Sequence, residues 1–162
     1  MKTAICPGSF DPVTLGHVDI ITRASKMFEK VIVAVMVNPS KVPSFTIEER
    51  TLFLKEALRN LGNIEIVSFD GLLADYARER KAMALVKGLR AVSDFEYEFQ
   101  MALTNKKLNS ELETVFFTTS AENMFLSSSV VKQIACFGGD ISKFVPGCIH
   151  DAIKQRLYKG GK

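Results

Sequence analysis

Several side chains of types that commonly bind phosphate follow predicted strands in this sequence. Together they indicate one anion site. They are His17, Lys41, Lys87, Arg90 and the serine cluster at residues 127–129. Ammonium and guanidinium groups balance phosphate charge, while imidazole and hydroxyl groups donate hydrogen bonds to phosphate oxygens. Because the carboxyl ends of parallel strands meet at one edge of a sheet, we expect these groups to converge there. The combination favours a polyphosphate ligand.

The turn that ends at His17 has the composition of a ligand-binding loop. It holds two glycines and two prolines between a predicted strand at residues 2–6 and a predicted helix at residues 18–28. Gly8 and Gly16 are predicted to let backbone N–H groups approach an anion. Glycine and proline alone fit an ordinary strand-to-helix loop equally well. An imidazole gains nothing from the helix dipole at this end, however, so we interpret His17 as functional.

Apolar runs and helical periodicity alternate along the chain, as expected for an α/β fold. The predicted strands cover residues 2–6, 30–37, 63–69, 82–87 and 113–118. The predicted helices cover residues 18–28, 46–61, 72–80, 93–109, 130–137 and a final segment after residue 147. Thr46 and Glu49 have the spacing of a capping box, which predicts the start of the second helix. We therefore predict a single domain over residues 1–162, with a doubly wound, Rossmann-like sheet of about five parallel strands and helices on both faces.

The predicted helix at residues 93–109 carries apolar side chains on two sides. One side is predicted to belong to the core, and its residues are Phe95, Phe99 and Leu103. The opposite side fits either the core or a subunit contact, and its residues are Tyr97, Met101 and Leu108.

The composition excludes several classes of protein. The chain has 162 residues, of which 47% are hydrophobic and 24% charged, so it is a folded rather than a disordered chain. A net charge of +3 is too small to argue for nucleic-acid binding. Three cysteines without close pairing fit a reducing cytoplasm, and no apolar run is long enough to span a membrane. Two histidines argue against a protein zinc site, and neither the P-loop nor the dinucleotide-binding glycine motif occurs.

Three motifs resemble those of the nucleotidylyltransferase superfamily and, within it, the phosphopantetheine adenylyltransferase family. The first is Gly-Ser-Phe-Asp-Pro at residues 8–12 with Thr-Leu-Gly-His at residues 14–17, a pattern that the whole superfamily shares. The second, at residues 87–98, and the third, Leu-Ser-Ser-Ser at residues 126–129, are similar to stretches typical of the family. The resemblance covers essentially the whole chain.

The resemblance implies adenylyl transfer from ATP to 4′-phosphopantetheine, which gives dephospho-coenzyme A and pyrophosphate in cytoplasmic coenzyme A biosynthesis. The acceptor phosphate would attack the α-phosphate of ATP in line, so that no protein base or covalent nucleophile is needed. Mg²⁺ carried by ATP, with no protein ligands, would screen the triphosphate. The resemblance also implies a homohexamer, the usual assembly of the family. It makes coenzyme A a candidate feedback ligand and implies no nucleic-acid or membrane partner.

Matching the motifs position by position implies a role for each residue. His17 and Lys41 would be catalytic, the first by stabilising the α-phosphate and the second by holding the pantetheine phosphate. The acceptor would contact Ser9, Lys41, Leu73 and Lys87. The residues expected to bind ATP are Ser9, Phe10, His17, Gly88, Leu89, Arg90, Glu98, Asn123, Met124, Phe125, Leu126, Ser127, Ser128 and Ser129. The chain differs from the usual family pattern at two of these positions, with Lys87 in place of an arginine and Asn123 in place of an aromatic residue.

Three alternatives stay open on the residues alone. A nucleotidylyltransferase could use another phosphate acceptor, such as nicotinate mononucleotide or glycerol phosphate, although the stretch at residues 87–98 argues against this. A fragment related to the catalytic domain of class I aminoacyl-tRNA synthetases would share a Gly-x-His pattern at the start of a helix. The Lys-Met-Ser-Lys-Ser loop of those enzymes is absent, however. A non-catalytic sensor of coenzyme A or nucleotide could use the same scaffold, but it would not need His17, Lys41 and Arg90 together.

Overall fold

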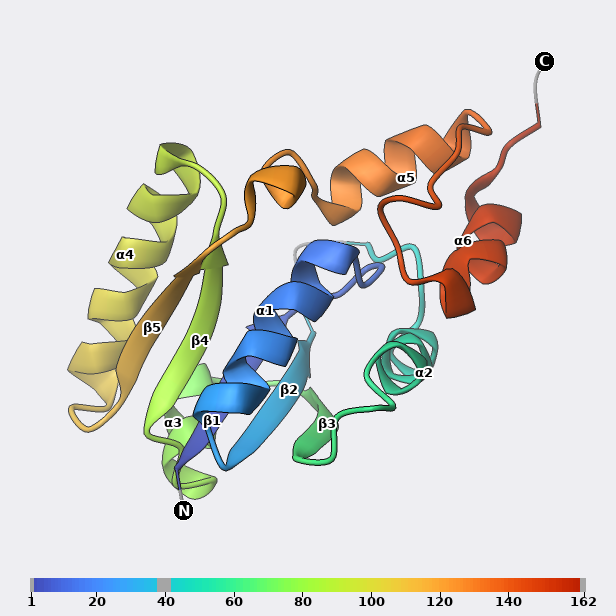
Figure 1. The fold of residues 1–162 in the computed structure, drawn as a ribbon. Coiled ribbons are helices and arrows are strands. Elements are labelled where there is room, and N and C mark those ends of the chain that lie inside the picture. The colour runs from blue at the N-terminus through green and yellow to red at the C-terminus, as the bar shows by residue number, and fades with distance from the viewer. Residues whose placement is uncertain (1, 38–41, 161–162) are drawn as a thin grey trace.

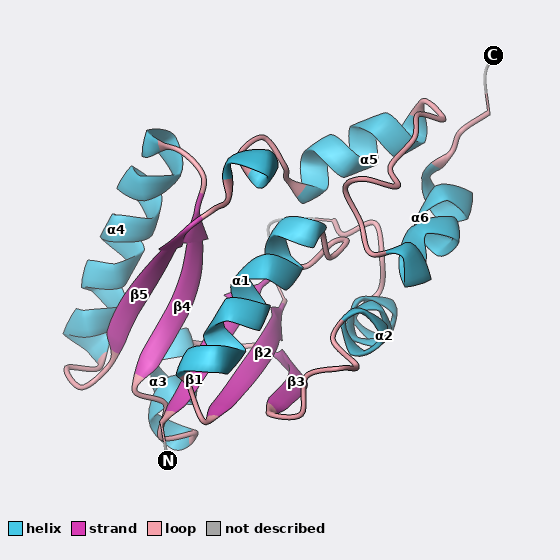
Figure 2. Ribbon diagram, viewed as in Figure 1, coloured by secondary structure: helices cyan, strands magenta, loops and turns pink. Residues whose placement is uncertain are grey.

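A parallel sheet forms the centre of the computed structural model, which describes residues 2–37 and 42–160 (Figure 1 and Figure 2). In this part of the chain the sheet has five strands, in the spatial order β3-β2-β1-β4-β5. Every neighbouring pair is parallel, which confirms the predicted doubly wound α/β fold. The strands are β1 (Thr3–Gly8), β2 (Lys30–Met36), β3 (Ile64–Phe69), β4 (Ala84–Leu89) and β5 (Glu113–Thr118).

Helices cover both faces of the sheet. They are α1 (Leu15–Met27), α2 (Ile47–Ala57), α3 (Leu73–Glu79), α4 (Val92–Leu108), α5 (Ser128–Cys136) and α6 (His150–Leu157), with single 3₁₀ turns η1 (Ala121–Asn123) and η2 (Gly147–Ile149). In Figure 1, α1 crosses in front of the sheet and α3 lies behind it, while α6 lies between α5 and α2. The capping box at α2 is present as predicted, because Thr46 and Glu49 exchange side-chain to backbone hydrogen bonds.

Alternate residues of the central strands pack into two cores. Ala4 and Cys6 of β1 face a core built with α1, α2, α5 and α6, whereas Ile5 faces a smaller core built with α3. The run from Val31 to Val35 in β2 is buried at every position, which is why it shows no polar alternation in the sequence. A strand buried on both faces is thereby held rigidly in the middle of the sheet.

The order of the strands reverses at β1, which pairs with β2 on one side and β4 on the other. In an open α/β sheet such a reversal leaves a crevice outside the carboxyl ends of the two strands, where ligands bind. The loop after β1 and the segments that follow β4 and β5 therefore meet at one place.

Several predicted boundaries differ from those of the structure. Helix α1 begins at Leu15 rather than at residue 18, because Thr14 caps it. Strand β4 runs to Leu89, so Gly88 lies in the strand and not in the exit loop predicted for it. Helix α2 ends at Ala57, before the predicted residue 61. These shifts are local and leave the predicted topology intact.

The prediction that one apolar stripe of α4 belongs to the core is wrong. Phe95, Phe99 and Leu103 are 42%, 47% and 56% exposed, and the Phe95 and Phe99 rings stack on each other at 5.4 Å. The inner side of α4 is polar instead: Glu98, in the first half of the helix, lines a cavity, and Asn105, near its carboxyl end, is buried. Because that inner side serves a polar site, the usual rule that places the apolar side of a helix inward fails here.

None of the helices in the described ranges is long and apolar enough to cross a membrane. The three cysteines, Cys6, Cys136 and Cys148, are all free thiols.

Candidate active site

A cavity of about 490 Å³ lies at the carboxyl ends of β1 and β4. The ends of these strands, the start of α1, the first turns of α4 and the segment before α5 all contribute to its wall. The sequence-predicted residues that line it are Phe10, His17, Lys87, Gly88, Arg90, Glu98, Asn123, Leu126, Ser127 and Ser128. Segments that are up to about 120 residues apart in the chain thus converge as the topology requires.

His17 has a structural role that the sequence reasoning missed. Its Nδ1 accepts a hydrogen bond from the backbone N–H of Thr14 at 3.0 Å, and its own N–H donates to Thr14 Oγ1 at 3.3 Å. This is a capping box in which an imidazole replaces the usual Glu or Gln. Because Nδ1 accepts, the proton of the neutral ring is assigned to Nε2. The cap therefore fixes both the orientation and the tautomer of His17.

The environment of His17 keeps its ring neutral. Burial, the largest cause, and the nearby charges of Arg90 and Lys87 together lower the pKa of His17 from 6.5 to about 4. The Phe10 and His17 rings also pack edge to face, with the ring centres 5.1 Å apart. At neutral pH the side chain can therefore donate one hydrogen bond from Nε2 without bringing a charge.

Both described cations of the cavity are paired with carboxylates of α4. Lys87 Nζ lies 3.2 Å from Glu98 Oε1. Arg90 forms a fork with Asp94, with Nε–Oδ2 and Nη2–Oδ1 distances of 2.9 and 3.1 Å. Arg90 Nη1 also donates to the carbonyl oxygen of Leu126 at 3.1 Å. Each cation is thus held in a defined direction before any ligand arrives.

Asp94 is a site residue that the sequence reasoning overlooked. Arg90 precedes α4 and Asp94 lies in the first turn of that helix, so the four-residue spacing of helical pairs did not apply and no periodic signal marked the contact. Tyr97 and Thr119 also line the cavity without having been predicted to do so.

Two hydroxyls of the serine cluster already have protein partners. Ser127 Oγ accepts the backbone N–H of Val130 at 3.1 Å and caps α5. Ser128 Oγ donates to the carbonyl oxygen of Pro12 at 2.7 Å and so ties α5 to the loop after β1. The cluster therefore has a structural role, whatever contact it makes with a ligand.

Gly8 and Gly88 leave room for neighbouring side chains. A Cβ atom at Gly8 would lie 2.9 Å from Phe10 Cζ, and one at Gly88 would lie 3.1 Å from Ile20 Cγ1. The expected approach of an anion to Gly8 stays a prediction, but the packing of the Phe10 ring gives a second reason for glycine there.

The remaining predicted residues lie outside the cavity wall or outside the described chain. Leu73 begins α3 and packs against the smaller core. Met124 and Phe125 are 54% and 58% exposed. The other predicted residues that do not line the cavity are Ser9, Leu89 and Ser129. Lys41 lies outside the residues that the structure describes.

The comparisons with known proteins agree with this geometry. A cytidylyltransferase-like family model matches residues 5–134. A phosphopantetheine adenylyltransferase of Caldanaerobacter subterraneus subsp. tengcongensis is 55% identical over 98% of this chain and 99% of its own. Phosphopantetheine adenylyltransferases of Lachnoclostridium phytofermentans and Alkaliphilus metalliredigens are 52% and 54% identical, over 99% and 96% of this chain and 98% and 99% of their own.

Two solved structures share the fold at low sequence identity. One is the nicotinic acid mononucleotide adenylyltransferase of Plasmodium falciparum complexed with NaAD, with a TM-score of 0.71, 17% identity and 99% coverage of both chains. The other is a candidate nicotinate-nucleotide adenylyltransferase of Vibrio parahaemolyticus, with a TM-score of 0.72, 19% identity and coverage of 99% of this chain and 98% of the other.

Proposed function

This chain belongs to the phosphopantetheine adenylyltransferase family, and from that premise we propose how its cavity performs the reaction. The protein is a nucleotidyltransferase of coenzyme A biosynthesis, which transfers the adenylyl group of ATP to 4′-phosphopantetheine and releases pyrophosphate. Relatives that are 52–55% identical carry this activity in their names, so a different phosphate acceptor or a non-catalytic sensor is not favoured.

The acceptor phosphate is the nucleophile in the proposed mechanism. Its second pKa is about 6, so near pH 7 it is largely a dianion and needs no protein base. One of its oxygens forms a new bond to the α-phosphorus of ATP. The bond from that phosphorus to the bridging oxygen breaks, and pyrophosphate leaves with the electron pair. The protein contributes position and electrostatic stabilisation.

His17 is proposed to stabilise the transition state through its Nε2–H. The single observation that carries the proposal is the cap that leaves this neutral donor in the cavity together with Lys87 and Arg90. We propose that the Nε2–H donates to an α-phosphate oxygen as charge builds up during transfer. Arg90 would contact the ATP phosphates and Lys87 the acceptor, while Lys41 would add a further cation on the acceptor side. Ser9 and Phe10 would contact ATP through the turn after β1.

Mg²⁺ is proposed to enter with ATP. The described residues contain no group of three or more His, Cys, Asp or Glu side chains placed to hold a metal ion. The carboxylates of the cavity are also engaged, Asp94 by Arg90 and Glu98 by Lys87. The chemistry of these donors therefore fits an ion held by phosphate oxygens, which supplies charge neutralisation of the triphosphate.

A homohexamer in the cytoplasm is the proposed state of the protein. The apolar side chains of α4, such as Phe99 and Leu103, are about half exposed, and a second copy of the chain would cover them. The three free thiols suit a reducing compartment. Analytical ultracentrifugation would test the subunit number. Coenzyme A is a candidate feedback ligand, since it contains the whole product of the reaction.

Pyrophosphate release tests the function directly. Purified protein with ATP, Mg²⁺ and 4′-phosphopantetheine should release pyrophosphate, whereas nicotinate mononucleotide and glycerol phosphate should give only background rates. Folded protein that releases none with phosphopantetheine, or that prefers another acceptor, would refute the proposal. Tight binding of coenzyme A without turnover would instead favour a sensor.

A further inference from the structure

The turn after β1 adopts an unfavourable backbone conformation at Phe10. Its φ angle is +47°, in the left-handed region that a side chain with a Cβ atom seldom adopts. Phe10 is only 4% exposed, lines the cavity and packs edge to face with the His17 ring. The conformation at Phe10 therefore affects where His17 and the cavity wall lie. Such a conformation persists only where the surroundings hold it in place.

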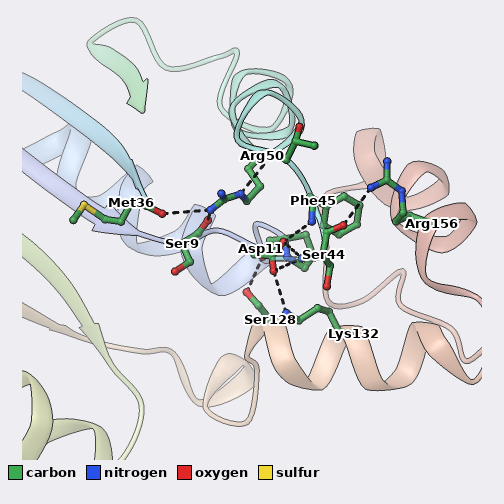
Figure 3. A network of polar contacts seen from close by, with 11 residues as sticks. Ser9, Asp11, Met36, Ser44, Phe45, Arg50, Ser128, Lys132 and Arg156 are labelled. Carbon is green, nitrogen blue, oxygen red and sulfur yellow. Dashed lines mark hydrogen bonds and ion pairs between the residues drawn. The ribbon is translucent and has the colours of Figure 1, made fainter. Parts of the chain in front are cut away.

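Arg50 of α2 holds the residue that precedes Phe10. Arg50 is 3% exposed, and its Nη1 donates to the carbonyl oxygens of Ser9 at 2.8 Å and Met36 at 3.4 Å. Its Nε donates to the carbonyl oxygen of Thr46 at 3.3 Å. Figure 3 shows the side chain reaching from α2 to the ends of β1 and β2. One buried side chain thus joins the ends of both strands to the first turn of α2.

Asp11 holds the residue that follows Phe10. Its carboxylate is largely buried and accepts the backbone N–H groups of Ser44 and Phe45, each at 2.9 Å. The same carboxylate accepts Lys132 Nζ of α5 at 3.1 Å. These contacts lie together on the side of the turn that faces Ser44 and α5 (Figure 3). The strained residue is therefore fixed on both sides, by α2 before it and by α5 after it.

We propose that Arg50, Asp11 and Lys132 are positioning residues that hold the turn at Phe10 and so place Ser9, Phe10 and His17 for adenylyl transfer. The proposal rests on the function proposed above. None of the three lines the cavity, so they act through the turn rather than on the substrates. Burying charged groups costs solvation, and apolar residues of similar volume often stabilise a fold as well or better. The contacts are thus explained better by the geometry they impose than by stability alone.

Lys132→Met tests the proposal with little risk to folding. The lysine side chain is 30% exposed, and after its removal Asp11 keeps the N–H groups of Ser44 and Phe45. Lys30→Met is the matched control: Lys30 is 33% exposed, and its partner Glu65, 2.5 Å away, keeps Arg80. Lys30 is the first residue of β2, at the amino end of that strand, whereas the cavity lies at the carboxyl ends of β1 and β4.

We expect Lys132→Met to lower kcat by about 10- to 100-fold, the cost of a small misplacement of catalytic groups. Lys30→Met should stay within about twofold of wild type, as expected for a partly exposed ion pair away from the site. Lys132→Arg, which restores the cation, should recover most of the rate. Equal kcat values for Lys132→Met and Lys30→Met, or a loss of rate that only follows a lower melting temperature, would overturn the proposal.

Arg50→Lys gives a second test with a readout that does not depend on turnover. A lysine keeps the charge but cannot span the carbonyl oxygens that the guanidinium joins. Calorimetry should show about tenfold weaker binding of Mg-ATP to Arg50→Lys and Lys132→Met than to wild type and Lys30→Met. Unchanged affinity and unchanged kcat would refute the positioning role. Failure of the wild type to release pyrophosphate with any acceptor would refute the proposed function instead, and the ATP affinities would still test the turn.

Discussion

His17 combines two roles in one side chain, and two substitutions separate them. Its Nδ1 accepts the N–H of Thr14 in the capping box of α1, while its Nε2–H is the proposed donor to the α-phosphate. Glutamine is a normal residue at this position of a capping box, so His17→Gln keeps the cap through its side-chain oxygen. Alanine removes the cap as well as the imidazole. Comparing the two variants therefore distinguishes the folding role from the catalytic role.

The structure gives a magnitude for each role. Loss of an N-terminal cap interaction costs about 1 kcal/mol, which lowers the melting temperature of a domain of this size by about 2–4 °C. We expect that shift in His17→Ala and little shift in His17→Gln. Removal of one positioned donor to a developing charge costs about 10²- to 10³-fold in rate, and the partial burial of His17 near Lys87 and Arg90 favours the upper end. Both variants should therefore lose kcat by several orders of magnitude.

Pyrophosphate release at saturating ATP and phosphopantetheine measures kcat, and calorimetry measures the affinity for ATP. The affinity should change much less than kcat, because the Nε2–H acts mainly on charge that develops during transfer. A His17→Gln variant that turns over within about tenfold of wild type would contradict the assigned role, since no positioned donor would then be needed. A loss of rate in His17→Ala alone would show that the cap, not the Nε2–H, carries the effect.

The remaining predictions concern pH, Arg90 and Phe10. The pKa of His17 is 6.5 unfolded and about 4 folded, so the unfolded chain binds the extra proton, and stability present above pH 6.5 is lost as the pH falls towards 4. Chemical denaturation should show that wild type loses about 2 kcal/mol more than His17→Gln between pH 7 and pH 5, and equal losses would contradict the assigned pKa. Asp94→Asn should raise KM for ATP by about tenfold by loosening Arg90, with a small change in melting temperature, and an unchanged KM would argue against the fork as an orienting contact. Gly8→Ala should lower kcat and stability because its Cβ would lie 2.9 Å from the Phe10 ring, and a neutral result would show that the ring can move freely.

The sequence was sufficient for the topology and for the convergence of the site. The β-branched run of β2 and the capping box of α2 are local patterns. Each depends only on residues close in sequence, so the element that it predicts is present in the structure. The meeting of His17, Lys87 and Arg90 then follows from a general rule about the carboxyl ends of parallel strands. The roles of Gly16 and Lys41 toward a ligand stay predictions.

Contacts between distant segments could not be predicted in the same way. Lys132 pairs with Asp11 across 121 residues, and no pattern in either segment marks the other. Arg50 binds backbone carbonyl oxygens, which every residue has. Its partners therefore cannot be identified from the residue types in the sequence. The error at α4 has a related origin, because an amphipathic pattern does not reveal that the polar side lines a site.

The balance of charge in the cavity indicates how such a site works on two anions. Among the described residues that line it, Lys87 and Arg90 are matched by Glu98 and Asp94, and His17 is neutral, so the formal charges cancel. A site built mainly to attract polyanions would carry excess positive charge. Here the carboxylates instead fix the directions of the cations, and the cap fixes that of the imidazole. Groups that are already oriented need no reorganisation during transfer. Under that condition, fixed dipoles and paired charges stabilise the transition state more than the ground state.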